Sequence, residues 1–155
     1  EMQRSLVGSE MCIRDRDKIR YFNMGNYTSA LLLLARLMLA CLYMISGVPK
    51  LLSFTGTIDK MASLGLIFPA ITAAIVVLVE IVGALMIVFG FFTRPVSIIL
   101  CLYTVFASFL GHAFWTMPAE LAHGNMIHFY KNICISGGFL ALVVSGPGRI
   151  SVDRR

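Results

Sequence analysis

Two opposite charges stand inside long apolar runs of this chain. Arg36 falls within the first run and Glu80 in the middle of the second. An isolated charge at that depth costs about 2.5–3.5 kcal/mol on insertion scales, and two opposite charges on adjacent helices relieve that cost by pairing. The sequence therefore predicts an intramembrane ion pair between Arg36 and Glu80. Two interpretations of it stay open, an interhelical clamp that fixes register and a polar pocket that tunes a proton or ligand site.

Further hydrogen-bonding side chains recur at helical spacing in these runs. Successive helical residues turn by about 100°, so a polar stripe continues from Arg36 toward the far end of the first run. The third run carries a second stripe of polar residues along one face. The first turns of the fourth run carry a cluster of polar residues. Amide, ammonium, hydroxyl and imidazole groups can all donate hydrogen bonds to a ligand, although outer lysines also snorkel toward lipid headgroups. The candidate ligand-binding residues are Tyr43, Lys50, His112, Lys131 and Asn132.

The sequence lacks the patterns that usually identify an enzyme or a metal protein. It contains no Gly-rich phosphate loop, no G-x-S-x-G elbow and no H-E-x-x-H motif. The spacing of its histidines and of Glu120 matches no metal-ligand pattern, so no metal site is expected. The four cysteines form no C-x-x-C pair. Whether the chain has catalytic activity, and through which residues, is left open.

The elements that must position these residues are long apolar segments. Four of them cover residues 31–48, 66–92, 96–117 and 126–145. Each is close to the ~20 residues that cross about 30 Å of hydrocarbon, and backbone groups in lipid must be paired within the segment, which makes the segments helices. The sequence therefore predicts an all-α fold, an integral membrane four-helix bundle in contact with the lipid bilayer.

Composition excludes the other classes of protein. Hydrophobic residues make up 58% of the 155 residues and charged residues only 14%. Of the 21 charged residues, only eight fall between residues 21 and 148, too few to keep a soluble globular domain dispersed. The net charge is +5, and eight of the 13 basic residues are gathered at the two ends. That distribution fits the cytoplasmic flanks of membrane spans better than nucleic-acid binding.

The chain divides into three predicted parts. Residues 1–27 form a polar tail, of which residues 4–16 resemble translated sequencing-adapter sequence and are set aside. Residues 28–148 form the membrane domain, and residues 149–155 form a basic tail. Four spans put both ends on one side, and the excess of lysine and arginine on that side predicts that both termini are cytoplasmic. The connections 51–65 and 116–125 are expected to be loops and then lie outside.

The polar residues also assemble into a recognisable series. Arg36 is followed by Ser46-Gly47-x-x-Lys50-Leu51, by Glu80-x-x-Gly83-x-Leu85 and by Gly90-x-x-Thr93-Arg94. Then come His112-x-Phe114-Trp115, Phe129-x-Lys131-Asn132, Gly137-Gly138, Gly146-Pro147-Gly148 and Ser151-x-Asp153. Each fragment is weak alone, but their order over roughly 120 residues resembles the DoxX family of small prokaryotic membrane proteins.

The resemblance implies a four-helix bundle in the inner membrane of a prokaryotic cell, associated with redox or respiratory systems. It makes quinone the candidate cofactor and a redox protein subunit the candidate partner, and self-association is compatible with it. A second hypothesis is a non-catalytic structural or assembly subunit, in which the same polar residues only hold helices together. A third is a small transporter or proton path, which four short spans without broken helices make the weakest of the three.

Overall fold

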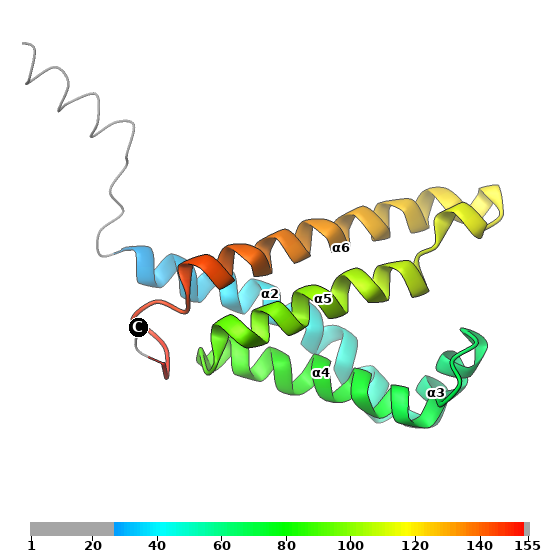
Figure 1. The fold of residues 1–155 in the computed structure, drawn as a ribbon, viewed down its shortest axis with the longest axis horizontal. Helices are drawn as coiled ribbons and strands as arrows, with labels where there is room; N and C mark the ends of the chain where they lie inside the picture. The colour runs from blue at the N-terminus through cyan, green and yellow to red at the C-terminus, as the bar shows by residue number, and fades with distance from the viewer. Residues whose placement is uncertain (1–26, 154–155) are drawn as a thin grey trace, which may run out of the picture.

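The computed structural model describes residues 27–153, and it is built from helices (Figure 1). The elements run in the order α2 (Thr28–Leu52), α3 (Phe54–Ser63), α4 (Pro69–Phe89), α5 (Thr93–Gly111), the 3-10 helix η2 (Phe114–Thr116) and α6 (Ala119–Ser145). No strand occurs in this range. The predicted all-α class is confirmed, while the prediction that residues 4–16 are foreign lies outside the described residues.

Four of these helices are long and apolar enough to cross a membrane. They are α2, α4, α6 and the segment Thr93–Thr116, which joins α5 to η2. Their outer surfaces carry many exposed Leu, Ile, Val and Phe side chains, which lipid accepts and water does not. The four-span bundle expected from the sequence is therefore confirmed.

The two long connections are more helical than the sequence predicts. Most of 51–65 is the helix α3, and α6 begins at Ala119, within the segment expected to be a loop. Both stretches contain charged residues and glycine, which end an apolar run without ending a helix. A helix at or beyond the membrane surface can present polar residues to water, so hydropathy alone does not detect it.

The helices pack as two pairs. The most extensive contacts join α5 to α6 and α2 to α4, whereas α2 touches α6 only slightly. The two pairs lie close together at one end of the molecule and diverge toward the other (Figure 1). We call the first the terminal end, because α2 begins and α6 finishes there, and the second the distal end. The distal end carries α3, the short helix η2 and the start of α6.

The core between the pairs lies on the faces that helical spacing predicts. Arg36, Ala40, Tyr43 and Gly47 are the buried residues of α2, and Glu80 is buried in α4 together with five other residues at helical spacing. A cluster of buried apolar side chains, including Leu100 of α5 and Phe139 of α6, fills the space between the helices.

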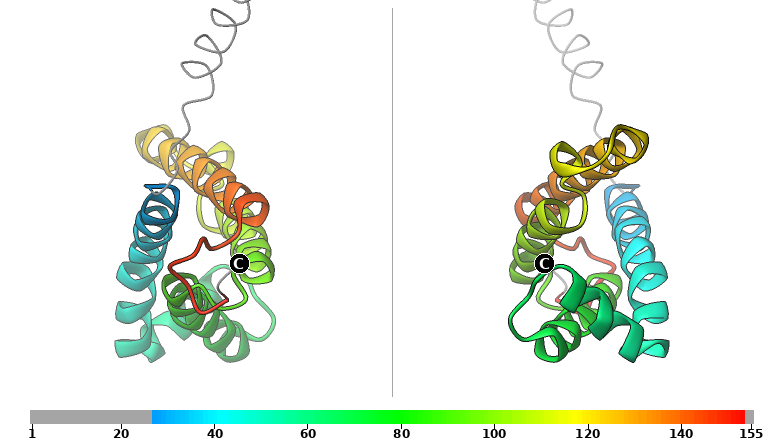
Figure 2. Two further views of the ribbon diagram at one scale, coloured as in Figure 1. Left: turned by 90° about the vertical axis from the view of Figure 1, so that its left-hand side faces the viewer. Right: turned by 90° about the vertical axis from the view of Figure 1, so that its right-hand side faces the viewer.

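A short C-terminal segment closes the terminal end. Residues 146–153, which we call the strap, leave α6 and cross the end of the bundle toward α2 and α4 (Figure 2). The backbone N–H groups of Val152 and Asp153 donate to the carbonyls of Phe89 and Gly90. The Asp153 carboxylate accepts the N–H of Thr93 at 3.2 Å, at the start of α5. The strap thus ties the end of α4 to the beginning of α5.

Candidate functional site

A close approach between α2 and α4 brings an ion pair together. Gly47 lies so near α4 that a Cβ atom on it would stand 3.0 Å from the Cβ of Glu80. One turn later on α2, the Lys50 ammonium meets the Glu80 carboxylate, with Nζ 2.5 Å from Oε1. The side chain of Glu80 is 4% exposed and that of Lys50 is 31% exposed. The carboxylate is therefore buried, and the ammonium reaches it from a more open position.

The predicted pair between Arg36 and Glu80 is wrong. Glu80 pairs with Lys50, and Arg36 donates instead to the backbone carbonyl of Ile150 in the strap. The guanidinium lies against Gly90, just beyond the end of α4, and is fully buried there. Since α2 and α4 run antiparallel with Gly47 facing Glu80, Arg36 is displaced from Glu80 by 11 residues of α2, or about 16 Å along the helix axis.

Glu80 is the centre of a polar network that reaches a third helix. The hydroxyl of Tyr103 on α5 donates to Glu80 Oε1 at 2.5 Å, so one carboxylate oxygen accepts from both Tyr103 and Lys50. Lys50 also donates to the Ser46 hydroxyl at 2.9 Å. The third ammonium proton of Lys50 is left for another acceptor. The network therefore joins α2, α4 and α5, and the third N–H group of Lys50 can still donate a hydrogen bond.

A second hydrogen bond crosses from α2 to α5 beside this network. The Thr104 hydroxyl donates its proton to the carbonyl of Leu100, so in its contact with Tyr43 the tyrosine hydroxyl is the donor. The ring of Tyr43 packs edge-on against Phe139 of α6. Tyr43 therefore touches two neighbouring helices.

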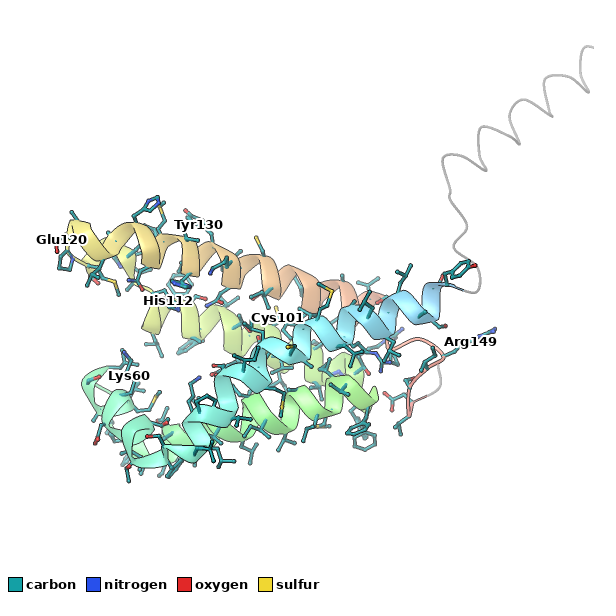
Figure 3. The ribbon with its side chains drawn as sticks, turned by 180° about the vertical axis from the view of Figure 1, so that it is seen from behind. Lys60, Cys101, His112, Glu120, Tyr130 and Arg149 are labelled. Atoms are coloured by element: carbon teal, nitrogen blue, oxygen red, sulfur yellow. The ribbon has the colours of Figure 1, made fainter. Side chains whose placement is uncertain are left out.

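These polar groups line a cavity between the diverging helix pairs. Its volume is about 570 Å³, and its walls come from α2, α3, α4, α5 and α6. The polar lining residues include the Glu80 network, with Lys50 and Tyr103, and also Tyr43, His112 and Asn132. Lys60 of α3 also lines it, and Figure 3 shows Lys60 and His112 at the distal end on either side of the space between α3 and α5. The sequence-predicted candidates are thus largely brought together.

The histidine at the distal end is fixed by α6. His112 Nδ1 is 3.0 Å from the side-chain oxygen of Asn125, and the His112 ring stacks on that of His128 with centroids 5.1 Å apart. The cavity is lined by Asn132 but not by Lys131, whose side chain is exposed on α6. Of the five candidate ligand residues, Lys131 alone is therefore placed outside the cavity.

Several lining residues were not predicted from the sequence. Tyr103 and Thr104 lie in an apolar run, and Lys60 lies in the segment expected to be a loop. One signal was available for Tyr103, because a tyrosine in the middle of a membrane span needs a partner for its hydroxyl. No comparable signal marks Lys60, since its place depends on the path of α3 across the distal end.

Comparison with known proteins gives consistent relatives. The DoxX family model matches residues 31–113. The inner membrane protein YphA of Escherichia coli K12 is 44% identical over 137 residues, which cover 88% of this chain and 98% of YphA. The inner membrane protein YqjF of the same bacterium is 37% identical over 123 residues, which cover 79% of this chain and 88% of YqjF.

A more distant similarity extends to a eukaryotic protein. The Surfeit locus protein 4 homolog of Schizosaccharomyces pombe is 31% identical over 86 residues, which cover 54% of this chain and 28% of that protein. No solved structure matches. The matched family segment holds Arg36, Lys50, Glu80 and His112, and the two bacterial relatives extend the similarity over most of the bundle. The chain is an integral membrane protein that belongs to the DoxX family.

Proposed function

We propose that this protein is an inner-membrane subunit associated with redox or respiratory chemistry, and that its distal cavity binds the head group of a quinone. The observation that carries the proposal is the cavity itself, in which polar groups from all four spans converge within largely apolar walls. A volume of about 570 Å³ lies inside the range of small-molecule sites, about 300–1,000 Å³.

The polar groups fit the head group of such a ligand. Ring carbonyls accept hydrogen bonds, and the free proton of Lys50 and the amide of Asn132 can donate them. The Nδ1–H of His112 already donates to Asn125, so Nε2 of this ring would accept from a hydroxyl of the reduced head group. A bound quinone would supply the exchange of electrons together with protons. The contribution of this chain would be to orient the ring and to hold a proton between Tyr103 and Glu80 Oε1, where the hydroxyl already donates to the carboxylate.

The walls fit an isoprenoid tail as well. Ile75 of α4 and Phe106 and Leu110 of α5 line the cavity and are also exposed on the outside of the bundle. Because these side chains are apolar and lie on membrane-spanning helices, this side of the cavity opens toward lipid. A ligand dissolved in the membrane would reach the polar groups from here without passing through water.

Retention of quinone after gentle solubilisation tests the proposal. Mass spectrometry of the purified wild type is expected to detect co-purified quinone. Ala107→Trp places an indole inside the cavity and is expected to abolish retention. The matched variant Ala141→Trp, on the exposed face of α6, is expected to leave retention unchanged.

A second pair of variants examines the polar groups. His112→Ala removes one hydrogen-bonding group and is expected to lower quinone affinity about three- to tenfold. Lys131→Ala removes a charge outside the cavity and is expected to have no effect. If the wild type retains no quinone and a stable protein partner co-purifies instead, the proposal fails and the structural or assembly role replaces it.

We also propose that both termini are cytoplasmic, because lysine and arginine are more frequent in the sequence before the first span, after the last span and in the 92–95 connection than in the other two connections and their flanks. The exposed residue Thr55 on α3 reports the opposite side. In cells that express Thr55→Cys, an impermeant thiol reagent is expected to label the protein from outside the inner membrane. The background for this measurement is the variant with its native cysteines changed to alanine. Labelling that requires disruption of the inner membrane would reverse the topology.

A further inference from the structure

A second hollow lies at the terminal end, away from the cavity, and we infer that it binds an anionic phospholipid. This groove has a volume of about 540 Å³ and is lined by Leu33 of α2, by Val88 and Phe89 of α4, and by Ile150, Ser151 and Val152 of the strap. Its walls are thus mostly apolar, and they come from three segments that are distant in the sequence.

The strap exposes apolar side chains on its outer surface, although it lies beyond the last membrane-spanning helix. Ile150 is 51% exposed and Val152 is 60% exposed. Phe89, at the end of α4, is 61% exposed beside them. Side chains of this kind gain free energy when acyl chains cover them. The groove therefore lies within the membrane and is suited to the upper part of an acyl chain.

The charge beside the groove selects the kind of lipid. Arg149 precedes Ile150, and its side chain is exposed and points away from the helices at the terminal end (Figure 3). Its backbone N–H lies 3.4 Å from the Ser29 hydroxyl in the first turn of α2. The carboxylate of Asp153 is turned toward the N–H of Thr93, and Arg36 is buried behind Ile150. The surroundings are therefore positive, which complements an anionic head group.

The depths of these groups match the two parts of a lipid. Ser29 lies in the first turn of α2, and Leu33 lies four residues further on, about 6 Å deeper along the axis. The strap is held at this level because Arg36 binds the carbonyl of Ile150. Arg149 thus stands at the height of the phosphate, and the groove begins where the acyl chain would follow.

Reconstitution into nanodiscs of equimolar phosphatidylcholine and phosphatidylglycerol tests this inference. Native mass spectrometry of the released protein is expected to show phosphatidylglycerol enriched about fivefold over phosphatidylcholine, the ratio expected for one basic side chain at an anionic lipid surface. Arg149→Gln is expected to remove the enrichment, and Arg149→Lys to keep most of it. Lys131→Gln, which removes an exposed charge in the middle of α6, is the matched control and is expected to change nothing.

The groove is tested separately from the charge. Val88→Trp fills the space between α4 and the strap and is expected to lower the retention of both lipids while Arg149 remains. Equal retention of the two lipids by the wild type would overturn the inference. So would an equal loss of enrichment in Arg149→Gln and Lys131→Gln, which would show a general effect of charge, or full enrichment in Val88→Trp.

Discussion

Replacing Lys50 by methionine is expected to destabilise the bundle by about 3–5 kcal/mol, because it leaves the carboxylate of Glu80 buried without its cation. Glu80→Gln is expected to cost less, about 1–2 kcal/mol, because the ammonium of Lys50 is partly exposed and can turn into the cavity. The double variant Lys50→Met with Glu80→Gln should recover most of the first loss. Unfolding monitored in mixed detergent micelles measures the three free energies.

A second double-mutant cycle, between Arg36 and Glu80, is the control for the cycle between Lys50 and Glu80. Arg36→Met removes a charge that lies about 16 Å from Glu80 along the helix axis, by the rise of α2 from Arg36 to Gly47. Its effect should add to that of Glu80→Gln within about 0.5 kcal/mol, because the two side chains share no partner among residues 27–153. Additive losses in the Lys50–Glu80 cycle, or strong coupling in the Arg36–Glu80 cycle, would contradict this arrangement.

Replacing Gly90 by alanine is expected to destabilise the protein by about 3 kcal/mol or more. Gly90 has φ +68, where a side chain costs about 1–2 kcal/mol. A Cβ atom there would also overlap Nη1 of Arg36 and the Cβ of Ser151. Since Arg36 is fully buried, it can yield only by giving up its bond to Ile150, and overpacking of this kind adds about 1–3 kcal/mol.

The control for this prediction is Gly137→Ala. Gly137 lies within α6, and nothing stands within 4 Å of the position its Cβ would take. Alanine is the better helix former there by up to about 1 kcal/mol, so this variant should be neutral or slightly more stable. Thermal unfolding followed by circular dichroism compares the two. An equal loss of stability in both variants would mean that the loss of a glycine in itself, and not the backbone of Gly90 and the packing of Arg36 against it, decides the result.

The sequence predicted the spans and their buried faces but not the axial register between helices. Hydropathy reports how apolar a segment is, and helical spacing reports which residues share a face. Neither reports how far one helix projects beyond its neighbour. Arg36 and Glu80 both lie inside their own apolar runs, but α2 extends eight residues beyond the level at which Arg36 meets Gly90. The depth of a residue within its own span therefore does not show which residue of the neighbouring span lies at the same level. For this reason the sequence paired Glu80 with Arg36 and not with Lys50.

Some of the residues that line the cavity could be predicted from the sequence. Tyr43, Lys50 and His112 are polar residues within or at the ends of apolar runs, so each had to find a partner or a polar space. Lys131 and Asn132 are neighbours in the sequence, and helical geometry turns them 100° apart. The packing of α5 against α6 decides that Asn132 faces the cavity and Lys131 does not.

The strap also has a consequence for the order in which the protein is made. The carbonyl that receives the guanidinium of Arg36 belongs to Ile150, 114 residues later in the chain. Each helix pair can form from neighbouring helices as they leave the translocon, but Arg36 has no carbonyl from the strap until nearly the whole chain has been synthesised. A nascent chain that stops before residue 150 would hold an arginine inside the membrane without that partner. The terminal end of the bundle is therefore completed last. Premature termination leaves the charge of Arg36 in the membrane without its carbonyl partner.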